Sequence, residues 1–265
     1  MKNFKNKIVV ITGAGSGMGK EYAFQFAALG AKLALNDYNK ATLEEVKSEL
    51  NDKGFKDVMI DDFDVSNKDK MYAFADKVKE TFGNAHVVIN NAGIEGATVE
   101  FVEISDADFE RLMNINFYGV VYGSKAFLPH LIANNEGALV NVASVFGLHG
   151  MPTQSDYCAS KFAVRGFTEA LMVEFYDSPI QVHIVHPGGI NTNIAQHEMS
   201  AKFASKYLTT SSESIVKHII KGIRSNKMKI VYGQDSLRIW IAANFLPKRI
   251  STAIINYELK KRLDF

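Results

Sequence analysis

Short apolar runs alternate with longer amphipathic segments along most of this chain. The apolar runs occupy residues 7–11, 31–35, 57–63, 87–89, 137–142 and 180–185. Uninterrupted runs of this kind are typical of strands that are buried on both faces of a parallel sheet. Segments with helical periodicity lie between them, at 20–29, 40–53, 67–82, 106–132 and 154–175. The alternation predicts a single-domain α/β fold over residues 1–265, with helices on both faces of the sheet.

Glycine and small polar residues follow the predicted strands. They are Gly13 to Gly19, Asp37, Asp64, Asn90, Ser144 and Pro187. In open parallel sheets, ligands bind beyond the carboxyl ends of the strands. Because all of these residues come at that edge, the pattern predicts one binding site there.

Four glycines separate the first predicted strand from the first predicted helix, with the spacing Gly13-x-x-x-Gly17-x-Gly19. Glycines let the backbone approach a pyrophosphate closely, and the following helix offers free N–H groups and its positive end. The spacing is not the common G-x-G-x-x-G, because Met18 occupies the last glycine position of that pattern. A flexible loop without a ligand is the alternative, and four glycines in this setting favour the binding site.

Asp37 ends the second predicted strand, where a carboxylate can bind the adenosine ribose of a dinucleotide. A carboxylate accepts hydrogen bonds from both ribose hydroxyls and repels a 2′-phosphate, and Lys40 is the nearest basic residue. The pattern therefore favours NAD over NADP. Asp37 could also cap the helix that starts near Lys40. Asp64 could face the adenine or simply begin a turn.

Tyr157 and Lys161 lie four residues apart in the helix predicted for 154–175, so they share one side of it. A cation near a phenol favours the phenolate, which makes the pair a candidate for acid–base chemistry. Taken alone, it could equally be a half-buried aromatic beside a solvated lysine. Ser144 at the end of the preceding strand can meet the pair above the sheet edge. Asn116 lies inside the helix predicted for 106–132, although asparagine is unfavourable in a helix interior, so its presence indicates a specific role.

Composition excludes several classes of protein. Of 265 residues, 47% are hydrophobic and 22% are charged, as in soluble globular proteins. The net charge of +1 creates no general attraction to nucleic acid or acidic membranes. The single cysteine, Cys158, excludes an internal disulfide, and the seven histidines show no metal-site spacing. The first apolar run is too short for a signal peptide or a membrane span, so a cytoplasmic location is expected.

The final segment, 236–265, combines many apolar residues with six Lys or Arg, against only Glu258 and Asp264. Pro247 predicts its division into two helices. A basic amphipathic segment that contains a tryptophan, here Trp240, can lie on a membrane surface. It can also cap a substrate cleft or pack on a neighbouring subunit. Packing on protein is the commoner fate and is the preferred interpretation.

Together these motifs resemble those of the short-chain dehydrogenase/reductase family, over residues 7 to about 232. They are T-G-x-x-x-G-x-G at 12–19, N-N-A-G at 90–93, Asn116, Ser144, Y-x-x-x-K at 157–161 and P-G-x-x-x-T at 187–192. Each motif is short, but their order and spacing together are specific. One departure is Ala143, where many members carry a second serine. The resemblance implies a Rossmann-type, doubly wound sheet of about seven strands.

The resemblance also implies roles for single residues. Tyr157 would be the general acid/base, Ser144 would donate to the substrate oxygen, and Asn116 would hold a water for proton relay. Lys161 would lower the pKa of the tyrosine and bind the nicotinamide ribose. The predicted cofactor-binding residues are Gly13, Ser16, Gly17, Met18, Gly19, Asp37, Asp64, Val65, Asn91, Ala92, Gly93, Tyr157, Lys161, Pro187, Gly188, Ile190 and Thr192. Residues 190–211 are expected to form a substrate lid.

The predicted function is NAD-dependent interconversion of a secondary alcohol and a ketone. The apolar residues of the lid and the tail favour a lipophilic substrate. An NADPH-dependent ketoreductase and a non-catalytic dinucleotide sensor or scaffold on the same fold are the alternatives. The resemblance implies a homodimer or homotetramer in which helices 106–132 and 154–175 pair between subunits. Neither a metal nor a nucleic acid is expected.

Overall fold

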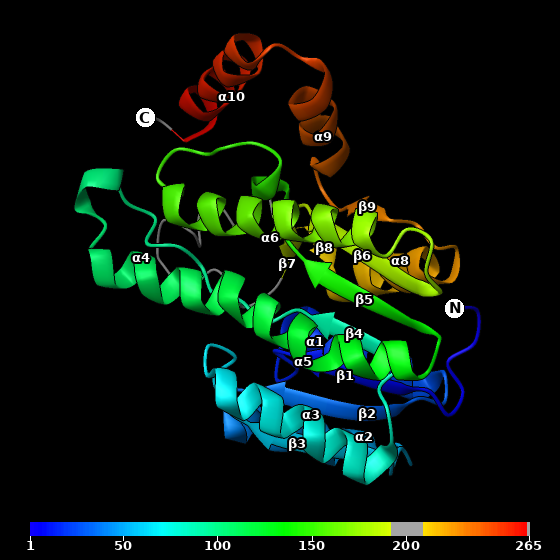
Figure 1. Ribbon diagram of the computed structural model, residues 1–265. Helices are drawn as coiled ribbons and strands as arrows, with labels where there is room; N and C mark the ends of the chain where they lie inside the picture. The colour runs from blue at the N-terminus through cyan, green and yellow to red at the C-terminus, as the bar shows by residue number, and fades with distance from the viewer. Residues whose placement is uncertain (192–208, 264–265) are drawn as a thin grey trace.

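Seven parallel strands form the central sheet, in the order β3-β2-β1-β4-β5-β6-β9 (Figure 1). The computed structural model describes residues 1–191 and 209–263. The strands are β1 (Ile8–Thr12), β2 (Lys32–Asp37), β3 (Val58–Asp62), β4 (Val87–Asn90), β5 (Gly137–Val142), β6 (Ile180–Pro187) and β9 (Lys229–Tyr232). The order runs outward from β1 to β3 and then returns to β4 on the other side of β1. The predicted doubly wound, Rossmann-type fold is confirmed.

Helices cover both faces of this sheet. One face carries α1 (Gly17–Ala28), α2 (Lys40–Asp52) and α8 (Ser212–Arg224). The other face carries α3 (Lys68–Phe82), α5 (Gly119–Ala133) and α6 (Ser155–Glu174), which lie in front of the sheet in Figure 1. The predicted bounds of α2, α3 and α6 are confirmed to within one residue, whereas α1 begins three residues earlier than predicted, at Gly17.

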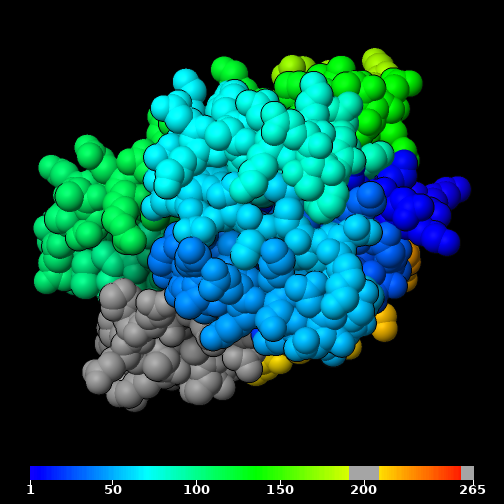
Figure 2. Space-filling model, turned by 90° about the horizontal axis from the view of Figure 1, so that it is seen from below, coloured from blue at the N-terminus to red at the C-terminus, as the bar shows by residue number. Residues whose placement is uncertain are grey.

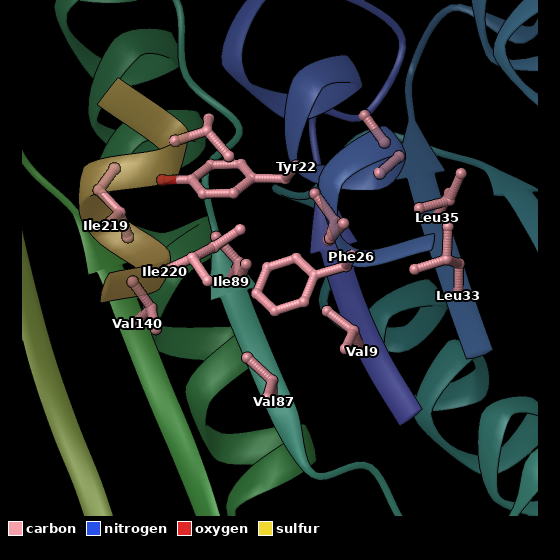
Figure 3. Close-up of a cluster of buried hydrophobic side chains, with 14 of the residues drawn as sticks. Val9, Tyr22, Phe26, Leu33, Leu35, Val87, Ile89, Val140, Ile219 and Ile220 are labelled. Carbon is pink, nitrogen blue, oxygen red and sulfur yellow. The ribbon is translucent and has the colours of Figure 1, made fainter. Parts of the chain in front are cut away.

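The hydrophobic core is divided by the sheet into two layers. Along β1, Val9 and Ile11 belong to one layer, whereas Ile8 and Val10 belong to the other. Figure 3 shows the first layer, where the rings of α1 meet side chains of β1, β2, β4, β5 and α8. The alternation follows from the opposite directions of successive side chains in a strand. It explains why these strands are apolar throughout.

The segment predicted as one helix, 106–132, contains an irregular turn. It consists of α4 (Asp106–Met113), a π-helical turn (Asn114–Tyr118) and α5. Pro129 lies inside α5, which nevertheless continues to Ala133. The π-helical turn contains Asn116, so the residue that is unfavourable in a regular helix lies where the helix is not regular.

The C-terminal segment leaves the sheet after β9 and forms α9 (Ser236–Phe245) and α10 (Lys248–Leu263), which lie beyond α6 in Figure 1. The division at Pro247 is confirmed. At the opposite end of the molecule, α2, β3 and α3 form the blue and cyan surface seen in Figure 2. A short two-stranded sheet joins β7 (Ile190–Asn191) to β8 (Thr210–Ser211). Among the described helices, none is both long enough and apolar enough to cross a membrane.

Candidate active site

The carboxyl ends of the central strands bring most of the predicted site residues to one edge of the sheet. Thr12 at the end of β1 pairs with Asn36 of β2. Asn90 at the end of β4 pairs with Asn141 near the end of β5. The glycine turn, the loop after β4 and Ser144 after β5 therefore lie at the same edge, which is where ligands bind in this kind of fold.

The glycine turn between β1 and α1 has a backbone that larger residues could not follow. Gly13 and Gly17 have φ angles of +67° and +51°, in the left-handed region that favours glycine. A Cβ atom on Gly19 would overlap the carbonyl oxygen of Gly13. Ser16 occupies the N-cap of α1 but makes no side-chain capping bond to the described residues. The first turn of α1 therefore keeps backbone N–H groups available, which suits a pyrophosphate.

The loop after β4 is tied to the glycine turn by Thr12. The Thr12 hydroxyl accepts hydrogen bonds from the backbone N–H groups of Asn91 and Ala92, at 3.0 and 3.1 Å. The Asn91 amide donates to the carbonyl oxygens of Thr12 and Gly13, at 3.1 and 3.3 Å. These bonds join two segments that are about 80 residues apart in the chain into one surface.

Asp37 is buried beside the glycine turn. One carboxylate oxygen accepts from the Gly15 N–H at 2.8 Å, and the other accepts from the Asn39 N–H at 3.0 Å. The cap of α2 is Asn39, whose side chain accepts from Thr42 N–H, so the interpretation of Asp37 as a helix cap is wrong. The carboxylate is thus held against the turn that would carry the pyrophosphate.

Asp64 supports a turn after β3. Its Oδ1 atom accepts from the backbone N–H and the hydroxyl of Ser66, at 2.9 and 2.8 Å. Asp64 therefore begins a turn, which is one of the two roles that the sequence offered for it. A contact between Asp64 and adenine, the other role, stays a prediction. Val65 is buried against the first residue of α5, Gly119, where a Cβ atom would lie 2.7 Å from a Val65 methyl group.

Ser144, Tyr157 and Lys161 meet at the ends of β5 and α6. The hydroxyls of Ser144 and Tyr157 form a side-chain hydrogen bond. The Lys161 amine lies 5.4 Å from the centre of the Tyr157 ring and donates to the Val142 carbonyl at 3.4 Å. The Lys161 side chain is 4% exposed. The structure therefore brings together the three side chains that the sequence selected.

Burial moves the pKa values of this pair in opposite directions. Burial raises the pKa of Tyr157 to about 12, and the hydrogen bond with Ser144 partly opposes this shift. Burial lowers the pKa of Lys161 to about 8. The sequence predicted that Lys161 would lower the tyrosine pKa, but the net direction in this structure is upward because desolvation outweighs the favourable contacts. Tyr157 is therefore a neutral phenol near pH 7.

Asn116 connects the π-helical turn to the loop after β4. Its Oδ1 atom accepts from Ile94 N–H at 2.8 Å, and its amide donates to the Ile94 carbonyl and the Ser160 hydroxyl at 3.0 and 3.3 Å. A Cβ atom on Gly93 would lie 3.1 Å from Asn116 Oδ1 and 3.3 Å from the Lys161 amine. Asn116 thus holds the loop close to Lys161.

The segment after β6 completes the described part of the edge. The Gly188 N–H donates to the Tyr232 carbonyl at 2.8 Å, and a Cβ atom on Gly188 would overlap the Gln234 carbonyl oxygen. Pro187 ends β6, and Ile190 is buried in β7. Thr192 and most of the predicted lid, 192–208, lie outside the described residues. Within the described ranges, no group of three His, Cys, Asp or Glu could hold a metal ion.

Comparison with known proteins identifies the family. The family model described as short chain dehydrogenase matches residues 7–202. The chain belongs to the short-chain dehydrogenase family. A Mycobacterium tuberculosis protein named SadH is 39% identical over 259 residues, which cover 93% of each chain. Human epidermal retinol dehydrogenase 2 is 36% identical over 259 residues, which cover 97% of this chain and 83% of the relative. A short-chain dehydrogenase/reductase from Burkholderia phymatum, solved in complex with NAD, has a TM-score of 0.83 and 27% identity and covers 98% of this chain and 96% of its own.

Two residues near this short-chain dehydrogenase site were not singled out by the sequence. Asp156 is buried, and its two carboxylate oxygens accept from the Tyr157 N–H at 2.7 Å and the Ala97 N–H at 2.9 Å. His186 is fully buried in β6, and its Nδ1 atom donates to the Ser144 carbonyl at 2.8 Å. The spacing of His186 matched no metal site, and no other role was predicted for it. A histidine directly before the Pro187-Gly188 pair was the available signal for His186.

His186 is expected to position Ser144. Burial lowers the pKa of His186 to about 4, so the ring is neutral and carries its proton on Nδ1 toward the Ser144 carbonyl. We expect His186→Ala to lower kcat about fivefold, since one hydrogen bond contributes about 1 kcal/mol, and to leave the substrate KM nearly unchanged. His186→Asn should restore most of kcat, because an asparagine amide can donate in place of Nδ1. Equal losses in the two variants would contradict this role.

Lys161 should lower the stability of the folded chain. Its pKa falls from 10.5 to about 8, which corresponds to about 3 kcal/mol for the buried charge. We expect Lys161→Met to raise the free energy of unfolding at pH 7 while removing activity. The unfolded chain binds more protons at this residue between pH 8 and 10.5, so the difference from wild type should shrink as the pH rises through that window. Urea unfolding of both proteins at several pH values measures this difference in the free energy of unfolding. A Lys161→Met variant that is less stable than wild type at pH 7 would contradict the prediction.

Proposed function

We propose that this protein is an NAD-dependent oxidoreductase that interconverts a secondary alcohol and a ketone. The proposal rests mainly on the hydrogen-bonded Ser144–Tyr157 pair beside the buried amine of Lys161. This group lies at the sheet edge that also carries the glycine turn. The dinucleotide, held by the glycine turn, Asp37 and Lys161, would supply the hydride acceptor or donor.

Tyr157 and Ser144 would fix the substrate oxygen between their hydroxyls. During reduction, Tyr157 gives its phenolic proton to the ketone oxygen, and during oxidation it takes that proton back. With a pKa of about 12, Tyr157 begins the reduction in its protonated form. Lys161 has a pKa of about 8 and keeps most of its positive charge at pH 7, so it stabilises the phenolate once the proton has left.

Asn116 would support this proton transfer by holding the loop after β4. Both polar atoms of its side chain already bond to Ile94, and its amide also bonds to Ser160. The proposed relay water would therefore bind beside the π-helical turn without replacing these bonds. Asp156 would also hold the loop after β4, because its carboxylate joins the start of α6 to Ala97 in that loop.

The substrate is proposed to be lipophilic. The ring of Phe146 packs edge-on against Tyr157, with 5.9 Å between the ring centres, and is partly exposed. A relative with 36% identity is named as a retinol dehydrogenase, and retinol is a lipophilic alcohol. A panel of secondary alcohols and ketones of increasing chain length, followed by absorbance of the reduced nicotinamide, tests this. The proposal fails if no member of the panel is turned over with either dinucleotide, which is the outcome expected of a non-catalytic sensor.

Asp37 should decide between the two dinucleotides. Its carboxylate is held by Gly15 and Asn39 and would lie where the 2′-phosphate of NADP binds. We expect wild-type protein to bind NADH at least tenfold more tightly than NADPH. Asp37→Asn should reduce the difference between the affinities for NADH and NADPH, because it removes the negative charge with little change in the shape of the side chain. Fluorescence titration of both variants with both dinucleotides measures this, and tighter NADPH binding by the wild type would show an NADPH-dependent ketoreductase instead.

The protein is also proposed to form a homodimer or homotetramer through the face of α5 and α6. Several large side chains are exposed there, including Tyr118 at the end of the π-helical turn, directly before α5, and Phe162 and Val173 on α6. Exposed apolar side chains on neighbouring helices are suited to pairing with the same helices of a second subunit. Light scattering on a size-exclusion column determines the number of subunits.

A further inference from the structure

Seven exposed apolar side chains on α9, α10 and the link between them form a surface that the rest of the described chain does not cover. They are Leu237, Ile241, Phe245, Leu246, Ile250, Ile254 and Tyr257. Leu237 is 62% exposed, Phe245 is 70% exposed and Tyr257 is 66% exposed. Of the sixteen large hydrophobic side chains that are exposed among the described residues, these seven lie within 21 consecutive positions. We call them the C-terminal apolar surface.

Helical spacing places these side chains in two stripes. On α9, Leu237, Ile241 and Phe245 follow one another at intervals of four. On α10, Ile250, Ile254 and Tyr257 follow at intervals of four and three. Residues with this spacing share one side of a helix. Each helix therefore presents a continuous apolar side, as expected of a helix with a partner outside the chain.

A buried hydrogen bond between Ser251 and His149 connects α10 to the body of the protein. Ser251 is fully buried, and its hydroxyl lies 3.1 Å from Nε2 of His149. The same hydroxyl donates to the Lys248 carbonyl at 3.1 Å, within the first turn of α10. Because His149 lies between Ser144 and Tyr157 in the chain, α10 is held beside the loop that joins the two proposed active-site hydroxyls.

The charges of this segment indicate the kind of partner. Residues 236–265 contain six Lys or Arg and two Asp or Glu, whereas the rest of the chain contains 24 and 27. Arg238 is next to Leu237, and Lys248 and Arg249 come directly before Ile250. Positive charge thus accompanies the exposed apolar side chains, while the remaining protein is slightly negative. Basic residues interleaved with apolar and aromatic residues are typical of helices that lie in the surface of an anionic bilayer.

A second copy of the chain fits this surface less well. In a twofold dimer the same patch meets itself, so two segments with an excess of positive charge would face each other. The dimensions also favour lying on a bilayer over crossing it. The ten residues of α9 extend about 15 Å, about half the thickness of the hydrocarbon core.

We propose that the C-terminal apolar surface docks this protein on an anionic phospholipid bilayer. The apolar stripes of α9 and α10 enter the boundary between headgroups and acyl chains, and the neighbouring Lys and Arg side chains contact the lipid phosphates. The inference is independent of the proposed function, because it concerns binding to lipid and not turnover. If both hold, α10 brings the active-site loop close to a surface that dissolves lipophilic substrates.

The test is sedimentation of the full-length protein with vesicles of phosphatidylcholine alone or with added phosphatidylglycerol. We expect binding to the mixed vesicles that weakens at high salt, and much weaker binding to phosphatidylcholine alone. The double variant Phe245→Ser/Ile254→Ser and the double variant Lys248→Glu/Arg249→Glu should each bind mixed vesicles at least tenfold more weakly. The matched control is Phe101→Ser/Val102→Ser, which removes two exposed apolar side chains outside both this surface and the proposed subunit interface and should bind as the wild type does.

Two further measurements distinguish a lipid bilayer from a second subunit as the partner of this surface. Thermal unfolding of each variant confirms that it is folded, and light scattering reports its number of subunits. The proposal is overturned if the wild type does not sediment with mixed vesicles, or if the C-terminal variants and the control bind equally. It is also overturned if the variants at Phe245 and Ile254 convert an oligomer into a monomer without changing lipid binding, because a second subunit would then cover this surface.

Discussion

Tyr157→Phe should lower kcat by about a thousandfold, within the range of 10²–10⁴ that general acid–base catalysis contributes. The substitution removes only the hydroxyl that bonds to Ser144 and that would exchange a proton with the substrate oxygen. The ring, its contact with Phe146 and the nearby Lys161 amine are retained. Dinucleotide affinity should therefore change little. Steady-state kinetics together with fluorescence titration separates the two quantities.

Tyr22→Phe is the matched control for this prediction. Tyr22 lies in the core on α1, and its buried hydroxyl makes no hydrogen bond to the described residues (Figure 3). Removing a buried hydroxyl that lacks a partner is expected to leave stability unchanged or to raise it. Turnover by Tyr22→Phe should equal that of the wild type. Near wild-type turnover by Tyr157→Phe would show that another group moves the proton.

Gly19→Ala should abolish dinucleotide binding and destabilise the fold. The added Cβ atom would overlap the Gly13 carbonyl oxygen, which belongs to the backbone and cannot rotate away. Overpacking of this kind costs about 1–3 kcal/mol, occasionally more. Gly166→Ala on α6 is the control, since a Cβ atom there meets nothing within 4 Å, and alanine in a helix should stabilise by about 0.5–1 kcal/mol. Urea unfolding compares the two variants.

Ser16→Asp keeps the binding prediction testable if Gly19→Ala does not fold. Aspartate is a favourable N-cap residue and should maintain or raise the stability of α1. Its negative charge would lie where the pyrophosphate is expected, so NADH affinity should fall at least tenfold. Unchanged affinity in Ser16→Asp would mean that the dinucleotide does not use the start of α1.

The local pattern of the sequence was sufficient for six of the seven strands of the central sheet and for the helices between them, but not for α8 or β9. The strands are apolar throughout because both faces are covered, and this made them recognisable. The residues at their carboxyl ends converge in any parallel sheet, so Ser144, Tyr157 and Lys161 could be brought together before the structure was known. Asp37, predicted to bind the adenosine ribose, lies beside the glycine turn, and the helix cap that it could have supplied is Asn39.

Longer-range contacts could not be found in this way. The bonds of Thr12 to the loop after β4, of His186 to Ser144 and of Asp156 to Ala97 join segments between about 40 and 80 residues apart. No local periodicity encodes which of these polar groups meet. The π-helical turn around Asn116 could not be predicted for the same reason, because Asn116 bonds to Ile94 and Ser160, which are distant in the chain.

The sequence by itself determined the fold, the family and the residues that meet at the sheet edge, because short motifs in a parallel sheet have nearly fixed positions. Only the tertiary structure decided the pKa values of Tyr157 and Lys161, since desolvation depends on everything packed around a group. It also decided that the seven side chains of the C-terminal apolar surface remain exposed, because the amphipathic pattern of a helix does not specify what covers its apolar side.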